Sequence, residues 1–174
     1  MKKIVQLSAL LLVVLTCCYS CSPVKKNQES IPTFDWSDKV TSINQTDSLR
    51  YGTSYLSVYS QIYSYTEHTS IDLTATVSIR NTSETDSIYL LRANYYDTKG
   101  VAIESYLSQP ISIKTMETLE IVIAEFDKKG GTGANFIFEW ATKPNTSDPL
   151  FEAVMISTYG QQGLSFTTQG KRID

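Results

Sequence analysis

Two acidic residues in the C-terminal third of the chain are the first candidates for chemistry. Glu139 and Glu152 lie in two segments that are predicted to be strands, 136–141 and 151–157. If these strands pair antiparallel, the two carboxylates lie opposite one another, where like charges repel. A bound Ca²⁺, Arg80 or Arg92 from another strand, or a raised carboxyl pKa of the kind that acid catalysts have would then compensate. The pattern predicts an ion site or a hydrolase, and the alternative is two separate carboxylates that face solvent or pair with arginine.

A glycine-rich loop is the second candidate site. Gly130, Gly131 and Gly133 follow Lys128 and Lys129. Successive glycine amides can form a concave nest for an anion, and the lysines would add positive charge. The spacing is not that of a P-loop, so a nucleotide site is not indicated. The alternative is a strand connection that needs a positive φ and a close approach of the backbone.

Tyrosines are the third candidate. They recur between residues 55 and 65 and again at Tyr95, Tyr96 and Tyr106. Exposed aromatic rows can stack on sugar rings, which predicts a carbohydrate-binding module, whereas tyrosines that pack on a sheet need no ligand. The single histidine, His68, has no second His or Cys for a zinc site and cannot complete a Ser/His/Asp triad. We therefore expect no cofactor.

The three cysteines all lie directly behind an apolar N-terminal run. Lys2 and Lys3 precede this run, which is typical of an export signal peptide and is too short to span a bilayer. A cysteine at the cleavage point can carry acyl chains, which anchor a protein without a membrane-spanning helix. We expect Cys21 to carry the lipid, because it follows the small Ser20. Cys17 is the alternative acceptor, and a plain signal peptide is the alternative to a lipid anchor.

The candidate residues require a folded domain to position them. The length and composition of the 174-residue chain predict one such domain, preceded by a leader and a tether. We expect residues 1–20 to be a lipoprotein signal peptide, residues 21–52 a flexible tether rich in Ser, Thr, Asn and Gln, and residues 53–172 a folded domain. Removing the leader leaves 13 basic and 18 acidic side chains, a net charge of −5. Because such a charge repels phosphate, no nucleic-acid partner is expected.

The folded part reads as a series of short strands without an amphipathic helix. In residues 71–80 apolar and polar side chains alternate, as a half-buried strand requires. Asp97-Thr98-Lys99-Gly100 predicts a turn, and further strands follow up to residue 168. About eight such strands predict an all-β fold, which we expect to be a single antiparallel, immunoglobulin-like β-sandwich; a closed barrel is the alternative.

Five blocks of the folded part occur together and in order: Ser60–Tyr63, Leu73–Asn81, Tyr95–Gly100, Gly130–Phe136 with Glu139-Trp140, and Glu152–Ile156 with Gln162-Gly163. Over about residues 52–170 they resemble a family of small exported bacterial proteins and lipoproteins that is catalogued only as a domain of unknown function, number thirty-one twenty-four. Gln61 departs from that family, in which a histidine is expected. The resemblance implies export and a β fold and supplies no activity.

Together these patterns predict a bacterial lipoprotein that is exported and held to the cell envelope through Cys21. Ser22 behind the lipid acceptor, in place of Asp, favours the outer membrane in a Gram-negative host. The expected role of the β-sandwich is a non-catalytic binding or envelope-interaction module, with an envelope protein or a glycan as its partner. The alternatives are a carbohydrate-binding module that uses the tyrosine rows and a hydrolase that uses the carboxylate pair.

Overall fold

The computed structural model describes residues 35–44, 46–158 and 163–174. The leader, Cys17, Cys21 and the first part of the expected tether lie outside these residues. Within them the secondary structure is two short 3₁₀ turns, η1 (Ser37–Lys39) and η2 (Gly131–Gly133), and twelve strands. The strands are β1 (Arg50–Ser57), β2 (Gln61–Ser64), β3 (Thr66–Asp72), β4 (Thr74–Arg80), β5 (Ile88–Tyr96), β6 (Ala102–Ser105), β7 (Ile111–Ile113), β8 (Thr118–Ile123), β9 (Asn135–Thr142), β10 (Leu150–Ser157), β11 (Leu164–Gln169) and β12 (Lys171–Arg172).

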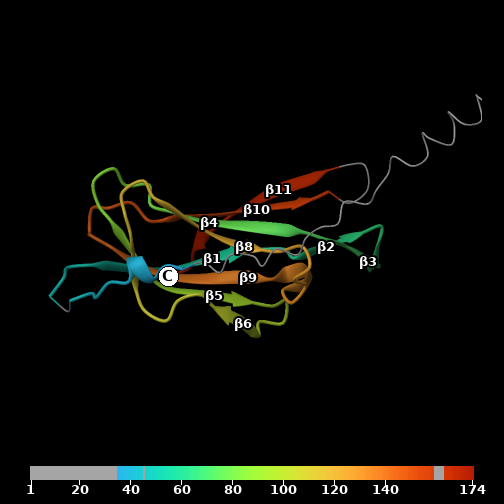
Figure 1. Ribbon diagram of the computed structural model, residues 1–174, viewed down its shortest axis with the longest axis horizontal. Coiled ribbons are helices and arrows are strands. Elements are labelled where there is room, and N and C mark those ends of the chain that lie inside the picture. Colours follow the sequence, from blue (N-terminus) through green and yellow to red (C-terminus); the bar gives the residue numbers. More distant parts are fainter. Residues whose placement is uncertain (1–34, 45, 159–162) are drawn as a thin grey trace, which may run out of the picture. The chain divides into compact units, whose positions relative to one another are not determined.

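The strands form two packed sheets and one hairpin, all of them antiparallel (Figure 1). One sheet has the order β12-β1-β9-β5-β6, with β7 also paired to β5, and the other has the order β11-β10-β4-β8. Strands β2 and β3 pair only with each other and project from one end of the domain. Each large sheet ends in edge strands, so the expected β-sandwich is confirmed and the closed barrel is excluded.

The core fills the space between the sheets because apolar residues alternate along each strand. The inward face of β9 carries Phe136, Phe138 and Trp140, which are all fully buried. Phe138 stacks on Phe136 with 5.4 Å between ring centroids and on Phe151 of β10, in the other sheet, with 4.3 Å. This aromatic stack joins the two sheets at the centre of the domain.

Four central strands have the arrangement of an immunoglobulin-like sandwich. In that fold strands B and E pair in one sheet, strands C and F pair in the other, and the chain crosses between sheets from B to C and from E to F. Here β4 pairs with β8, β5 pairs with β9, and the chain crosses from β4 to β5 and from β8 to β9. The outer positions are filled differently, since β1 lies beside β9 and β10 lies beside β4.

Twelve strands are present where about eight were expected, partly because two predicted strands are each divided and partly because the short β12 was not predicted. Residues 55–65 divide between β1 and β2, and residues 71–80 divide between β3 and β4. The second division falls at Leu73, whose N–H donates to the Ser60 carbonyl at 2.9 Å, in register with the β2–β3 ladder. As a result, β2 and β3 form a hairpin that is paired with neither of the two large sheets.

The folded domain begins earlier than the expected boundary between residues 52 and 53. Strand β1 starts at Arg50, and Trp36 already packs against the core. The N–H of Thr41 donates to the Pro110 carbonyl at 3.0 Å, and Val40 forms an isolated bridge with Ile111. These contacts fasten the last part of the expected tether to the domain. Among the described residues no helix is long and apolar enough to cross a membrane.

Candidate functional site

The expected carboxylate pair does not form. Strands β9 and β10 belong to different sheets, so Glu139 and Glu152 lie on the two opposite outer faces of the sandwich. Glu139 pairs with Arg92 at 2.5 Å, and Glu152 pairs with Arg80 at 3.1 Å. The hypothesis of a shared ion site or catalytic pair is therefore wrong, and the alternative of separate, arginine-paired carboxylates is confirmed.

The glycine-rich loop uses its polar groups within the protein. The N–H of Gly131 donates to the Lys128 carbonyl at 3.2 Å, and the N–H of Gly133 donates to Thr98 Oγ1 at 2.9 Å. Thr98 Oγ1 in turn donates to the Gly130 carbonyl at 3.0 Å. Because these amides already have acceptors and Gly131 has a φ of +71°, the loop fits the alternative of a strand connection rather than an anion nest.

The tyrosines do not form one continuous platform. Tyr95 is buried in the core, and Tyr59 and Tyr106 pack against it. In contrast, Tyr63 and Tyr65 are exposed, with relative accessibilities of 62% and 101%. The exposed pair lies on the β2–β3 hairpin, so these two tyrosines could contact a ligand at that end of the domain.

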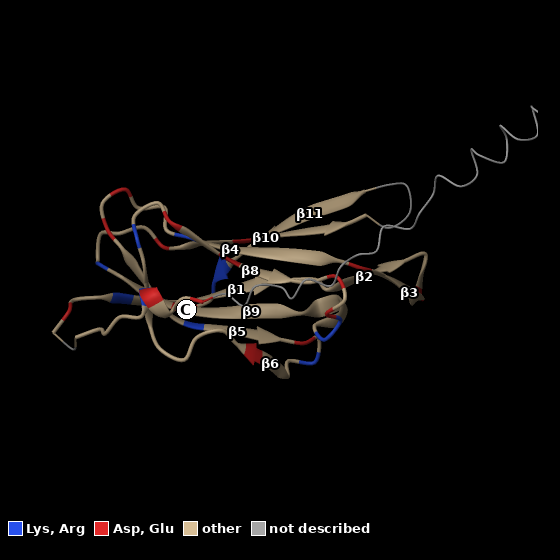
Figure 2. Ribbon diagram, viewed as in Figure 1, with Lys and Arg blue, Asp and Glu red and all other residues tan. Residues whose placement is uncertain are grey.

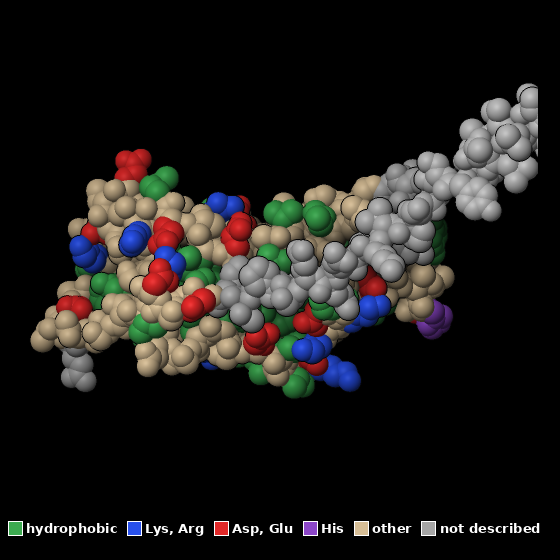
Figure 3. Space-filling view, in the orientation of Figure 1, with side chains coloured by type: hydrophobic (Ala, Val, Ile, Leu, Met, Phe, Trp, Pro, Cys, Tyr) green, Lys and Arg blue, Asp and Glu red, His purple; other side chains and the backbone are tan. Residues whose placement is uncertain are grey.

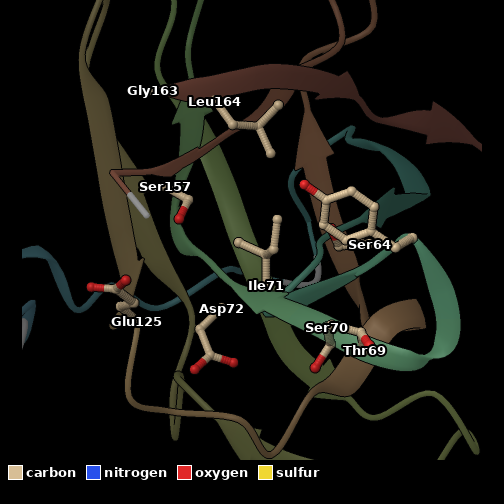
Figure 4. A pocket seen from close by; sticks show the side chains of 10 residues that line it. Ser64, Thr69, Ser70, Ile71, Asp72, Glu125, Ser157, Gly163 and Leu164 are labelled. Atoms are coloured by element: carbon tan, nitrogen blue, oxygen red, sulfur yellow. The ribbon is translucent and has the colours of Figure 1, made fainter. Parts of the chain in front are cut away.

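A cleft of about 460 Å³ lies between this hairpin and the ends of β10 and β11 (Figure 4). The hairpin supplies one wall, the segment after β8 supplies a second, and the end of β10 with the start of β11 supplies a third. Hydroxyl groups are the commonest polar groups in this lining. The lining residues are Ser64, Tyr65, Thr69, Ser70, Ile71, Asp72, Glu125, Ser157, Gly163 and Leu164.

The cleft has an acidic side and an apolar side. Asp72 and Glu125 lie next to one another at one side, whereas Ile71 and Leu164 face each other across the middle (Figure 4). Lys128 pairs with Asp72 at 2.6 Å, and this contact holds the pKa of the Asp72 carboxyl below its ordinary value. The Gln61 amide donates to the same carboxylate at 2.7 Å and lowers its pKa further. Asp72 is thus a charged acceptor at neutral pH.

Tyr65 has an unusual backbone conformation. It forms the tight end of the hairpin, between the paired residues Ser64 and Thr66, and its φ is +62°. A bulky residue in this region costs about 1–3 kcal/mol and is often found at functional sites. The sequence does not predict this backbone conformation, because Tyr, unlike Gly or Asn, is not typical of positions with a positive φ.

The opposite face of the same hairpin is also concave. This second hollow, of about 330 Å³, extends from His68 to the glycine-rich loop at Gly131 and Thr132. Thr69 and Ser70 line both hollows, so the hairpin is a partition between them. No group of three or more His, Cys, Asp or Glu residues suited to a metal ion occurs in the part of the chain that the structure describes.

Comparison with protein families identifies the domain. A family model described as "Protein of unknown function (DUF3124)" matches residues 51–173. The chain belongs to this family. The DUF3124 match begins in β1 and ends just after β12, so the sandwich, the hairpin and every residue that lines the cleft fall within it. No match is found among curated proteins or among solved structures.

Proposed function

We propose that this DUF3124 protein is an exported lipoprotein, anchored through Cys21, whose β-sandwich is a non-catalytic binding module in the cell envelope. The cleft beside the β2–β3 hairpin is its binding site. Support for export comes from the charged and apolar N-terminal pattern with cysteines directly behind it. Support for binding comes from the cleft, whose volume lies in the range usual for small-molecule sites.

The cleft chemistry favours a glycan as the ligand. A sugar presents hydroxyl donors and apolar C–H faces side by side, and the cleft offers carboxylate and hydroxyl acceptors next to Ile71 and Leu164. The aromatic ring of Tyr65, fully exposed at the tip of the hairpin, supplies a stacking surface. The combination of Tyr65 with the acidic side of the cleft is the observation that carries this proposal.

Metabolic labelling with a radioactive fatty acid tests the anchor. The full chain is expected to carry label and to sediment with membranes, with the outer membrane enriched in a Gram-negative host. Cys21→Ser is expected to lose both label and sedimentation, whereas Cys17→Ser, the matched control, keeps both. A labelled Cys21→Ser chain would move the lipid to another cysteine, and an unlabelled wild-type chain would remove the anchor.

Binding to an array of bacterial envelope glycans tests the cleft. The full chain, extracted in detergent, is compared with Tyr65→Gly, which removes the ring and suits the positive φ. Glycan binding is expected to fall at least about tenfold, while the free energy of unfolding stays equal or rises by about 1 kcal/mol. Tyr51→Ser, which changes an exposed tyrosine of β1, is the control that should bind normally. Silence of the wild-type chain on the array would contradict the glycan, and equal binding by Tyr65→Gly would remove Tyr65 from the site.

A further inference from the structure

The β2–β3 hairpin separates two hollows, and the proposed function uses only one of them. The cleft has a volume of about 460 Å³, and the second hollow, on the opposite face of the hairpin, has a volume of about 330 Å³. Both volumes lie in the range usual for small-molecule sites. Thr69 and Ser70 line both hollows, so a ligand that lies over these two residues reaches from one hollow into the other.

A bulge in β3 forms one wall of the second hollow. In the hairpin ladder Tyr63 pairs with Ser70, but the next residue of β2 pairs with Thr66, which leaves residues 67–69 outside the pairing. All three bulge residues line the second hollow. Figure 3 shows the histidine of this bulge standing out from the surface at one end of the domain, and its side chain is 85% exposed. The bulge therefore gives the hairpin a second ligand-accessible face.

The two exposed tyrosines of the hairpin serve different hollows. Tyr65 lines the cleft, and Tyr63 lines the second hollow. Side chains two residues apart in a regular strand point to the same side, so a regular hairpin would direct both rings into one hollow. The register shift between Tyr63 and Ser64, together with the φ of +62° at Tyr65, breaks this rule. Each hollow thus has one exposed aromatic ring on which a sugar can stack.

Polar groups continue from one hollow into the other. The Gln61 amide, in the second hollow, donates to the Asp72 carboxylate, in the cleft, at 2.7 Å. The same amide donates to Ser70 Oγ at 3.3 Å. Hydroxyl, amide and carboxylate groups are suitable partners for sugar hydroxyls. A ligand that crosses the hairpin over Thr69 and Ser70 therefore meets hydrogen-bonding groups along its whole length.

The charge around both hollows is negative. Asp72 and Glu125 line the cleft, Glu67 lines the second hollow, and the described lining of either hollow contains no Lys or Arg. With Lys128, which pairs with Asp72, the three carboxylates sum to a charge of −2 when the histidine is neutral. Figure 2 shows acidic and no basic residues on the hairpin. Because like charges repel, this surface disfavours an acidic polysaccharide and suits an uncharged one.

We propose that the cleft and the second hollow are successive subsites for one extended, uncharged oligosaccharide that crosses the hairpin over Thr69 and Ser70. One sugar unit stacks on Tyr65 in the cleft, and a later unit of the same chain stacks on Tyr63 in the second hollow. This inference rests on the proposed function, since it requires a glycan in the cleft. Contacts in the second hollow cost no further translational freedom, so a long chain binds more tightly than a short one.

Binding of glycan size ladders to the full chain in detergent tests the extended site. The probes are ladders of two to eight sugars of β-linked N-acetylglucosamine and of β-linked glucose, with polysialic acid as the anionic counterpart. Eight sugars of a neutral ladder are expected to bind at least about tenfold more tightly than two, and more tightly than polysialic acid. Equal affinity for two and eight sugars would overturn the extended site but leave the cleft. Silence on both neutral ladders would overturn the glycan as well, and preference for polysialic acid would overturn the uncharged ligand.

Variants in the second hollow locate the length dependence. Tyr63→Ser is expected to bind eight sugars as weakly as two, with its affinity for two sugars unchanged. Thr132→Trp, which fills the second hollow from the glycine-rich loop and leaves the hairpin unaltered, should give the same result. Tyr65→Gly, by contrast, should weaken both lengths. Thr82→Trp, at an exposed position between β4 and β5, is the matched control that keeps the length dependence. A length dependence that persists in Tyr63→Ser or in Thr132→Trp would overturn the second subsite.

Discussion

At the scale of single residues, Gly130 is the position at which the packing leaves least room. The Ser60 hydroxyl and the Tyr95 hydroxyl form a buried hydrogen bond of 2.8 Å. A Cβ atom at Gly130 would lie 1.9 Å from the Tyr95 hydroxyl oxygen and 2.6 Å from Ser60 Oγ. Gly130 thus allows the glycine-rich loop to close over this hydrogen bond, which is the close backbone approach expected of a strand connection.

Gly130→Ala is therefore expected to destabilise the protein by about 2–3 kcal/mol, through overpacking and loss of a buried hydrogen bond. Gly163→Ala is the matched control, because a Cβ there meets no atom within 4 Å, and its effect should stay within about 0.5 kcal/mol. Urea unfolding of both variants measures the difference. Equal stability of the two variants would mean that the loop moves freely away from Tyr95.

At the scale of elements, one ion pair fastens the N-terminal segment to the turn between β7 and β8. Lys39 Nζ lies 2.5 Å from Glu117 Oε1, and both side chains are mostly buried. Glu117 also accepts the Lys114 N–H at 2.7 Å. The hydrogen bond from Lys39 is the main cause that lowers the pKa of Glu117, and the same bond raises the pKa of Lys39.

The two pKa shifts define a pH window for this contact. A lowered carboxyl pKa stabilises the fold fully above the ordinary Glu value of about 4.3 and ceases to do so as the pH falls through the folded value. A raised Lys pKa stabilises the fold fully below about 10.4 and ceases to do so as the pH rises through the folded value. The pair therefore stabilises the domain from about pH 5 to about pH 10.

Lys39→Gln is expected to lower the free energy of unfolding by about 1 kcal/mol at pH 7, with little difference from the wild type at pH 2–3. Unfolding curves over this pH range measure the effect. Lys99→Gln, in the exposed β5–β6 turn, should change stability by less than about 0.5 kcal/mol at any pH. A constant difference between Lys39→Gln and the wild type down to pH 2 would show that the methylene stem of Lys39, not its charge, stabilises the segment.

Alternation in the sequence predicts which residues of a strand face the core, but it does not predict the partner strand. The turn predicted at residues 97–100 is confirmed, since it joins β5 to β6, and the alternation of apolar residues along β9 agrees with the burial of Phe136, Phe138 and Trp140. The pairing of Glu139 with Glu152 failed because adjacent strands in the chain, β9 and β10, enter different sheets. The cleft could not be predicted, since it depends on the detached hairpin and on the positive φ of Tyr65.

At the scale of the whole molecule, the two sheets share one core. Phe138 touches aromatic rings of both sheets and is completely buried. The chain crosses repeatedly between the sheets, so neither sheet consists of a continuous stretch of sequence. Both features favour unfolding of the domain as one cooperative unit.

Phe138→Ala is expected to cost about 3–5 kcal/mol, because it removes a ring from the centre of the core and leaves a cavity. The loss should appear equally in β5 of one sheet and β4 of the other, when amide hydrogen exchange is measured under native conditions. Phe126→Ala removes an aromatic ring that is 67% exposed and should change neither stability nor exchange appreciably. If protection in β4 persisted while protection in β5 was lost, the four-stranded sheet would be stable by itself and the shared core would not be what unites the fold.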